Sequence, residues 1–265
     1  MTTAKAYVKA ILLLLHTLFS YLTFVPSFLL KLVGKSNLLW RNWSLTLWGK
    51  GCARIIGMDI HVKGEPPKAP FFLVSNHLSY VDIFVYSAVS DVIFVAKSEV
   101  KSWPVIGFMM STMGIIFVDR SSRKDVMRVN KLISDNINPE QGILLFPEGT
   151  TSNGESVLPF KASLLAFPAE KEIPVNYASL SYYSESGKVD ISNDVCWWGD
   201  MEFFTHLLQL LRVQKFSVSV NFGGQRISDG DRKVLTSKLY NKISDQYTPI
   251  PQQKHIGERE VANNV

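Results

Sequence analysis

A histidine and an aspartate stand five positions apart in the stretch Asn-His-Leu-Ser-Tyr-Val-Asp. They are His77 and Asp82, and an apolar run at residues 70–74 precedes them. Near pH 7 an imidazole can take a proton from a hydroxyl and return it. A carboxylate beside the imidazole fixes its tautomer and stabilises the imidazolium. The pair therefore predicts general acid–base catalysis, although such residues taken singly are more often structural.

The elements around this pair must bring the two side chains together. A strand over residues 70–75 would end just before His77, at the strand end where open α/β sheets bind their ligands. On an ideal helix, residues five apart point about 140° away from each other, so the pair needs a turn before the next helix begins. We expect Ser79 to cap that helix and Asn76 to hold the loop.

Further blocks of the same character follow along the chain. They are Gly-Ile-Ile-Phe-Val-Asp-Arg at residues 114–120, Leu-Leu-Phe-Pro-Glu-Gly-Thr at 144–150, Phe-Lys at 160–161 and Ile-Pro-Val at 173–175. With the His-x4-Asp pair, this ordered series resembles the glycerolipid acyltransferase family, best known for 1-acylglycerol-3-phosphate acyltransferases. The resemblance implies an enzyme that moves a fatty acyl group from acyl-CoA or acyl-carrier protein to the free hydroxyl of a lysophospholipid. Lysophosphatidic acid giving phosphatidic acid is the simplest case.

The later blocks supply candidate substrate-binding residues. Arg120 would meet a phosphate bidentately, unless it pairs with the neighbouring carboxylate or a helix dipole. Glu148 would bind a glycerol hydroxyl or serve as a structural hydrogen-bond hub, and Gly149 lets the backbone approach a ligand. The resemblance implies that these residues and Thr150 bind the acceptor. Lys161 would contact phosphate or the acyl donor.

The identity of the acceptor stays open. Family members that act on lysophosphatidic acid commonly have arginine after the threonine, whereas this chain has Thr151. That difference and the segment at residues 197–202 resemble the lyso-ornithine lipid acyltransferase branch, whose acceptor carries no phosphate. For His206, one turn further on, an aromatic core cluster is the favoured interpretation. Lysophosphatidic acid remains the first expectation, and lyso-ornithine lipid is the alternative.

Other classes of function are less favoured. No Gly-x-Ser-x-Gly motif occurs, so direct attack of the acceptor on the thioester is simpler than a serine acyl-enzyme. Cys52 and Cys196 lack metal-ligand spacing, and we expect no metal and no cofactor besides the acyl-donor substrate. A non-enzymatic lipid-binding protein on the same scaffold would have no use for the His77–Asp82 pair. A hydrolase is a third class, which would release the acyl group as free acid instead of transferring it to lipid.

Composition and charge point to a lipid surface. Apolar residues make up 46% of the chain and charged residues 19%, and the net charge is +5. No block interleaves basic and aromatic residues as a nucleic-acid surface does, so we expect no nucleic-acid partner. Attraction to anionic lipid headgroups explains the positive charge better.

The N-terminal region has the composition of a membrane segment. Residues 10–30 carry no formal charge, and lysines flank the run on both sides. About 20 apolar residues suffice to span a bilayer as a helix, whereas a signal peptide would have a shorter apolar core. Because Pro26 would bend a spanning helix, we favour a helix pair bent near Pro26 and inserted into one leaflet. The active site would then face the cytoplasm, at the inner membrane in a bacterium.

The rest of the chain predicts one α/β domain. Strands are expected at residues 70–75, 92–96, 114–119, 142–146, 173–181 and 216–222, and helices around 79–89, 98–111, 123–136, 200–211 and 229–247. We expect a membrane segment at residues 1–45, an acyltransferase domain at 46–250 and a polar tail at 251–265. The family resemblance implies a mixed sheet covered by helices.

Overall fold

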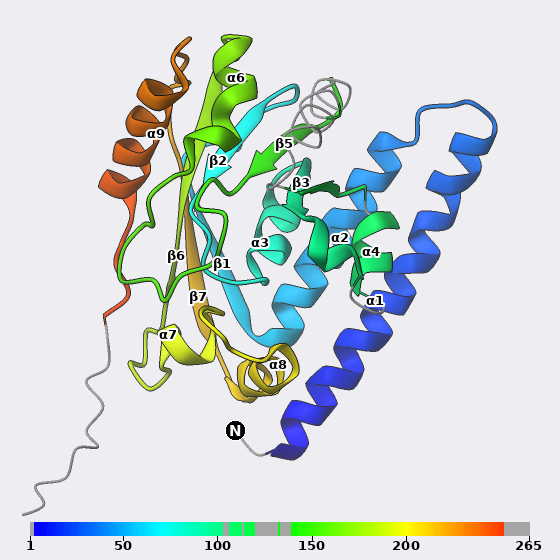
Figure 1. The fold of residues 1–265 in the computed structure, drawn as a ribbon. Coiled ribbons are helices and arrows are strands. Elements are labelled where there is room, and N and C mark those ends of the chain that lie inside the picture. Colours follow the sequence, from blue (N-terminus) through cyan, green and yellow to red (C-terminus); the bar gives the residue numbers. More distant parts are fainter. Residues whose placement is uncertain (1–2, 103–105, 113, 120–131, 133–138, 252–265) are drawn as a thin grey trace, which may run out of the picture.

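The computed structural model of the protein describes residues 3–102, 106–112, 114–119, 132 and 139–251 (Figure 1). Its strands are β1 (Met58–Lys63), β2 (Phe72–Ser75), β3 (Val92–Lys97), β4 (Ile116–Val118), β5 (Gly142–Leu145), β6 (Val175–Tyr183) and β7 (Phe216–Phe222). Within the described residues these strands form one sheet in the order β1-β7-β6-β2-β5-β3-β4. β7 runs antiparallel to β6 and parallel to β1, while the other neighbours are parallel. The predicted mixed α/β fold is confirmed.

Helices cover both faces of this sheet. They are α1 (Thr3–Leu32), α2 (Leu38–Ile56), α3 (Asp82–Val89), α4 (Ile106–Thr112), α6 (Ala166–Glu170), α7 (Ile191–Asp194), α8 (Phe203–Arg212) and α9 (Arg232–Gln246), with 3-10 turns η1 (Ser98–Ser102) and η2 (Ala162–Leu165). α2 and α3 lie on one face, and α6 and α9 lie on the other (Figure 1). Every residue of β2 and β5 is buried. A central parallel strand that is covered on both faces reads as a continuous apolar run, which is why these strands were predictable.

Most predicted elements agree with the structure. Differences fall at the edges of the sheet, where the apolar signal is weaker. Residues 58–63, for which no element was predicted, form the edge strand β1 with mostly exposed side chains. The single helix expected near 98–111 is a 3-10 turn followed by the short helix α4. Of the helix expected at 123–136, only residue 132 is described, and the polar tail beyond residue 251 also lies outside the described residues.

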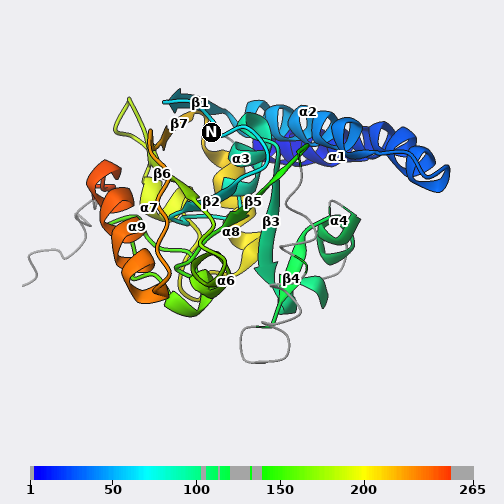
Figure 2. The ribbon, with the colours of Figure 1, turned by 90° about the horizontal axis from the view of Figure 1, so that it is seen from above.

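The N-terminal region is a helical hairpin, but its turn is not where it was predicted. The prediction of a bend near Pro26 is wrong. α1 continues through Pro26 to Leu32, and the chain reverses direction over residues 33–37. A proline weakens the backbone hydrogen bonding of its helix. In this hairpin α2 supplies hydrogen bonds beside the proline, since Trp40 Nε1 and Ser44 Oγ both donate to the Thr23 carbonyl. α1 and α2 lie side by side and reach beyond the sheet (Figure 2).

Several polar residues of α1 face the rest of the protein. Lys9 Nζ donates to the carbonyls of Ile56 and Val213, both at 2.8 Å. His16 Nε2 lies 3.2 Å from the Trp48 carbonyl. These contacts attach one side of α1 to the C-terminal ends of α2 and α8 and to the middle of α2. The predicted boundary at residue 45 falls inside α2, whose buried residues pack against the domain.

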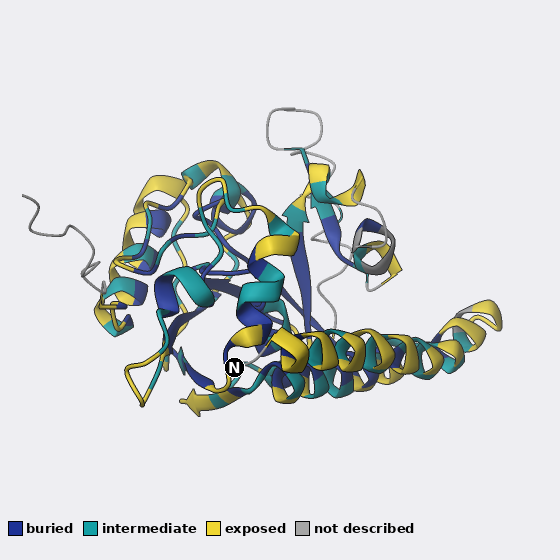
Figure 3. Cartoon of the chain, turned by 90° about the horizontal axis from the view of Figure 1, so that it is seen from below, coloured by how far each residue is buried: buried dark blue, intermediate teal, exposed yellow. Residues whose placement is uncertain are grey.

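The opposite face of α1 is apolar and exposed (Figure 3). Its exposed side chains are Tyr7, Val8, Ile11, Leu12, Leu14, Leu15, Leu18, Phe19, Leu22, Val25, Phe28, Leu29 and Leu32. The stretch Thr3–Leu30 is long and apolar enough to cross a membrane by length and composition. A surface helix in water turns its apolar stripe towards the core, whereas α1 turns its apolar stripe towards the outside. Exposed apolar surfaces of this kind mark sites of interaction with membranes or partners.

Candidate active site

Two loops meet at one edge of the sheet because their strands are parallel neighbours. β2 pairs with β5, with Val74 opposite Leu145, so both strands end at the same level. The loop after β2 carries His77, and the loop after β5 carries Glu148. The His77 backbone N–H donates to Glu148 Oε1 at 3.2 Å. Parallel pairing thus joins two blocks that lie 71 residues apart in the sequence.

His77 and Asp82 form the expected pair. His77 Nδ1 lies 2.7 Å from Asp82 Oδ2, and Asp82 is fully buried. The turn required before the helix is present, since the Asp82 N–H donates to the Ser79 carbonyl at 3.1 Å. The expected capping role of Ser79 is wrong. Instead, Asp82 Oδ2 accepts the backbone N–H groups of Leu78 at 2.8 Å and Ser79 at 3.2 Å, which fixes the carboxylate at the start of α3.

Neighbouring residues hold the histidine in place. Asn76 holds the loop as predicted, because its side chain donates to the Leu180 carbonyl at 2.8 Å and accepts from the Leu180 N–H at 2.7 Å. The His77 ring stacks on Phe146, with ring centroids 4.1 Å apart. Since Nδ1 faces the carboxylate, Nε2 is the nitrogen left to meet a ligand, and 20% of the side chain is exposed. A ring held in this way can accept a proton at Nε2 and return it.

Glu148 is a buried carboxyl group directly behind the histidine. Burial raises its pKa to about 9, against a lowering contribution from the hydrogen bond with the His77 backbone. Glu148 therefore carries a proton near pH 7 and adds no second negative charge beside Asp82. Gly149 follows with a φ of 76°, a left-handed conformation that favours glycine. Thr150 is exposed at the rim of the same turn.

This buried acid predicts a pH-dependent stability. Between its ordinary value of 4.5 and about 9, folded Glu148 keeps a proton that the unfolded chain releases. Raising the pH through this window therefore favours unfolding, by up to about 1.4 kcal/mol per pH unit. We expect the free energy of unfolding of Glu148→Gln, relative to wild type, to increase from pH 5.5 to pH 8. Urea unfolding in detergent micelles measures it, and an identical pH dependence of the two proteins would contradict a protonated Glu148.

Lys161 is tied to the same loop through its backbone. Its N–H donates to the Pro147 carbonyl at 2.9 Å, and its side chain is exposed. The structure thus brings this predicted residue next to the Glu148 turn.

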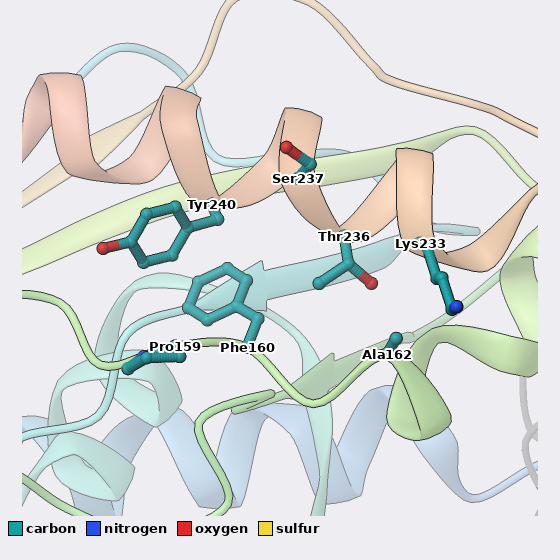
Figure 4. Close-up of a pocket in the computed structure, with 7 residues that line it drawn as sticks. All are labelled: Pro159, Phe160, Ala162, Lys233, Thr236, Ser237 and Tyr240. Atoms are coloured by element: carbon teal, nitrogen blue, oxygen red, sulfur yellow. The ribbon is translucent and has the colours of Figure 1, made fainter.

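A separate groove of about 400 Å³ opens between the segment at residues 159–162 and α9 (Figure 4). Its lining residues are Pro159, Phe160, Ala162, Lys233, Thr236, Ser237 and Tyr240, and it does not include the His77 pair.

Arg120 lies outside the described residues. The strand before it, β4, ends at Val118, and β4 is parallel to β3, which is parallel to β5. β4 therefore ends at the same edge of the sheet as the two loops that carry the histidine and the buried acid. Neighbouring strands are spaced about 4.8 Å apart, so β4 ends roughly 14 Å from β2 across the sheet.

Tyr182 was not predicted as a site residue. Its hydroxyl donates to Asp82 Oδ1 at 2.5 Å from strand β6, 100 residues further along the chain. No local sequence pattern predicts such a contact, because it arises from the pairing of β6 with β2.

His206 is buried in an aromatic cluster, in agreement with the favoured interpretation, and its Nδ1 lies 3.1 Å from the Tyr80 hydroxyl. Burial lowers the pKa of this histidine.

Comparisons with known proteins find related acyltransferases. The family model described as Acyltransferase matches residues 59–176. The chain is 32% identical over 207 residues to the 1-acyl-sn-glycerol-3-phosphate acyltransferase of Neisseria gonorrhoeae, covering 77% of this chain and 80% of that protein. It is 34% identical over 217 residues to the lyso-ornithine lipid O-acyltransferase of Brucella abortus, covering 77% and 81%.

A solved structure shares the fold. The 1-acyl-sn-glycerophosphate acyltransferase PlsC from Thermotoga maritima matches 90% of this chain and 97% of its own length, with a TM-score of 0.57. The two sequences are 18% identical, so this likeness bears on architecture alone.

Proposed function

Since the chain belongs to the acyltransferase family, we propose that it acylates lysophosphatidic acid at its free hydroxyl to give phosphatidic acid. The acyl donor would be the thioester of CoA or of acyl-carrier protein. The observation that carries this proposal is the His77–Asp82 hydrogen bond of 2.7 Å, which engages Nδ1 and leaves Nε2 for a substrate, in a loop whose backbone contacts Glu148. No cofactor is required in this proposal, because the thioester itself supplies the activated acyl group.

The proposed reaction is a direct transfer. His77 Nε2 accepts the proton of the acceptor hydroxyl as the hydroxyl oxygen attacks the thioester carbonyl carbon. Asp82 stabilises the imidazolium that forms. The tetrahedral intermediate collapses, the C–S bond breaks, and His77 returns the proton to the leaving thiolate. An ester bond replaces the thioester bond, and the histidine ends in its starting state.

The later blocks would bind the acceptor. In our proposal Arg120 and Lys161 neutralise the phosphate, and the turn at Glu148, Gly149 and Thr150 contacts the glycerol. The proximity of the Lys161 backbone to the Glu148 turn supports this grouping. A protonated Glu148 would be able to donate to a glycerol oxygen, which an ionised carboxylate cannot do.

A second acceptor has support of its own. Relatives named lyso-ornithine lipid O-acyltransferase match this chain at 33–34% identity, close to the value for the Neisseria enzyme. Thr151 stands where lysophosphatidic acid enzymes commonly have arginine. We therefore keep lyso-ornithine lipid as the alternative acceptor.

A competition assay tests the choice of acceptor. Purified wild-type protein receives equal amounts of lysophosphatidic acid and lyso-ornithine lipid in mixed micelles, with radiolabelled palmitoyl-CoA or palmitoyl-acyl-carrier protein as donor. We expect the label to appear mainly in phosphatidic acid. Label mainly in ornithine lipid would make the alternative the function of this protein.

We further propose that the N-terminal hairpin inserts into one leaflet of the membrane, with the active site facing the cytoplasm. The acceptor's acyl chain lies in the bilayer, so the enzyme must hold its site at the interface. The apolar outer face of α1 and the polar stripe that bonds it to the body support insertion along the hairpin's length. Trp40 and Trp43 lie beside it on α2, exposed and suited to the headgroup level.

Charges on the outer face of α1 should release the protein from membranes. Leu15 and Leu22 are 56% and 66% exposed, so lysine at both positions leaves the hairpin's internal contacts untouched. We expect the Leu15→Lys/Leu22→Lys protein to move from the membrane pellet to the soluble fraction, because each lysine opposes burial in lipid. Val234→Lys, at an exposed apolar position on α9, is the matched control and should pellet like wild type. A double variant that still pelleted fully would contradict insertion through this face.

A further inference from the structure

Tyr182 is a buried tyrosine that contacts the Asp82 carboxylate of the candidate active site. It lies on β6, is 2% exposed, and packs its ring edge-on against Phe216 at 5.9 Å between centroids. Its hydroxyl donates to Asp82 Oδ1 at 2.5 Å. A buried tyrosine hydroxyl normally finds a hydrogen-bond partner, but here the partner is the carboxylate that faces His77.

The two oxygens of Asp82 have different surroundings. Oδ2 accepts from His77 Nδ1 and from the backbone N–H groups of Leu78 and Ser79. Oδ1 faces Tyr182 instead. The hydroxyl therefore adds a contact at Oδ1 to those at Oδ2, and the two sides together fix the rotation of the carboxylate about its Cβ–Cγ bond. Without it, Oδ1 would be a buried charged acceptor that lacks this partner, which is costly and favours rotation or resolvation of the group.

We propose that Tyr182 is a positioning residue that holds the Asp82 carboxylate so that Oδ2 faces His77 Nδ1. This inference rests on the proposed function, because it assigns the histidine to the transfer step. Tyr182 touches no substrate in this account. It acts on the rate only through the carboxylate, which in turn orients the imidazole and stabilises its charged form.

Tyr182→Phe tests the proposal with the loss of one oxygen atom. The ring and its packing against Phe216 are kept, and only the hydrogen bond to Asp82 is removed. We expect kcat to fall by about tenfold, while the KM values of donor and acceptor stay at their wild-type levels. Tyr183→Phe is the matched control, because Tyr183 is the next residue of the strand and is 36% exposed. That variant should keep the wild-type kcat.

A spectroscopic readout separates positioning from packing. The proton between His77 Nδ1 and Asp82 should give a low-field proton resonance in detergent micelles, absent from His77→Ala. We expect Tyr182→Phe to shift or broaden this resonance and Tyr183→Phe to leave it unchanged. A wild-type kcat, an unshifted resonance, or a Tyr182→Phe protein that is unfolded by circular dichroism would each overturn the proposal. Full activity of His77→Ala would instead refute the proposed function, which is a separate outcome.

Discussion

Replacing His77 with alanine should abolish acyl transfer while leaving the fold and the membrane association intact. General acid–base catalysis by a positioned side chain contributes about 10²–10⁴-fold to a rate, so kcat should fall at least into that range. The loss should appear in kcat with both donors, because each thioester needs the acceptor hydroxyl to be deprotonated. The side chain is 20% exposed and stacks on one ring, so its removal costs little packing.

The matched control for this variant is His61→Ala. His61 is exposed on the edge strand β1, and its ring lies near that of Tyr183, at 6.2 Å between centroids. We expect this protein to retain wild-type kcat and KM. Circular dichroism and membrane pelleting verify that the His77→Ala protein is folded and anchored. Near-wild-type turnover by a folded His77→Ala protein would remove the mechanism.

Asp82→Asn should cause the second largest loss, and the structure specifies why. Two backbone N–H groups point at the Oδ2 position, at 2.8 and 3.2 Å, so the amide oxygen of asparagine should take that place. The oxygen can still accept from His77 Nδ1, and the tautomer is kept. What is lost is the negative charge that stabilises the imidazolium, and we expect kcat to fall by about 10²-fold.

Initial rates at saturating donor and acceptor measure this loss. Asp59→Asn is the control, because Asp59 forms an exposed ion pair with Lys215 at 2.7 Å, near the start of the edge strand β1. Exposed pairs contribute little to stability, so this variant should behave as wild type. An Asp82→Asn protein with wild-type kcat would assign Asp82 to folding of the loop instead of to the chemistry.

Much of the site could be predicted because its chemistry is concentrated in short blocks after apolar strands. β2 and β5 are buried runs, so the sequence indicated where each ends and which side chains follow. The contact of His77 with Asp82 needed only a turn, which the chain forms with its own backbone. Local sequence patterns are sufficient to predict a contact between residues that lie close together in the sequence, such as His77 and Asp82.

Long-range contacts escaped the sequence analysis. Tyr182 meets Asp82 because β6 pairs with β2, and no spacing in the sequence encodes that neighbour. The position of the N-terminal turn was also missed, since the effect of Pro26 depends on hydrogen bonds that α2 supplies across the hairpin. The inward-facing polar side of α1 also depends on long-range contacts, because Lys9 donates to carbonyls at the ends of α2 and α8.

The central claim is that the acyl group passes directly from the thioester to the acceptor hydroxyl with His77 as the base. A rapid-quench experiment with acyl-labelled palmitoyl-CoA and lysophosphatidic acid follows the label in four pools: donor, lipid, free acid and protein. We predict that every label lost from the donor is gained by phosphatidic acid, with none as free acid and none bound to the protein. Label accumulating as free palmitic acid would indicate a hydrolase, and label bound covalently to the protein would indicate an acyl-enzyme. Either result would contradict direct transfer.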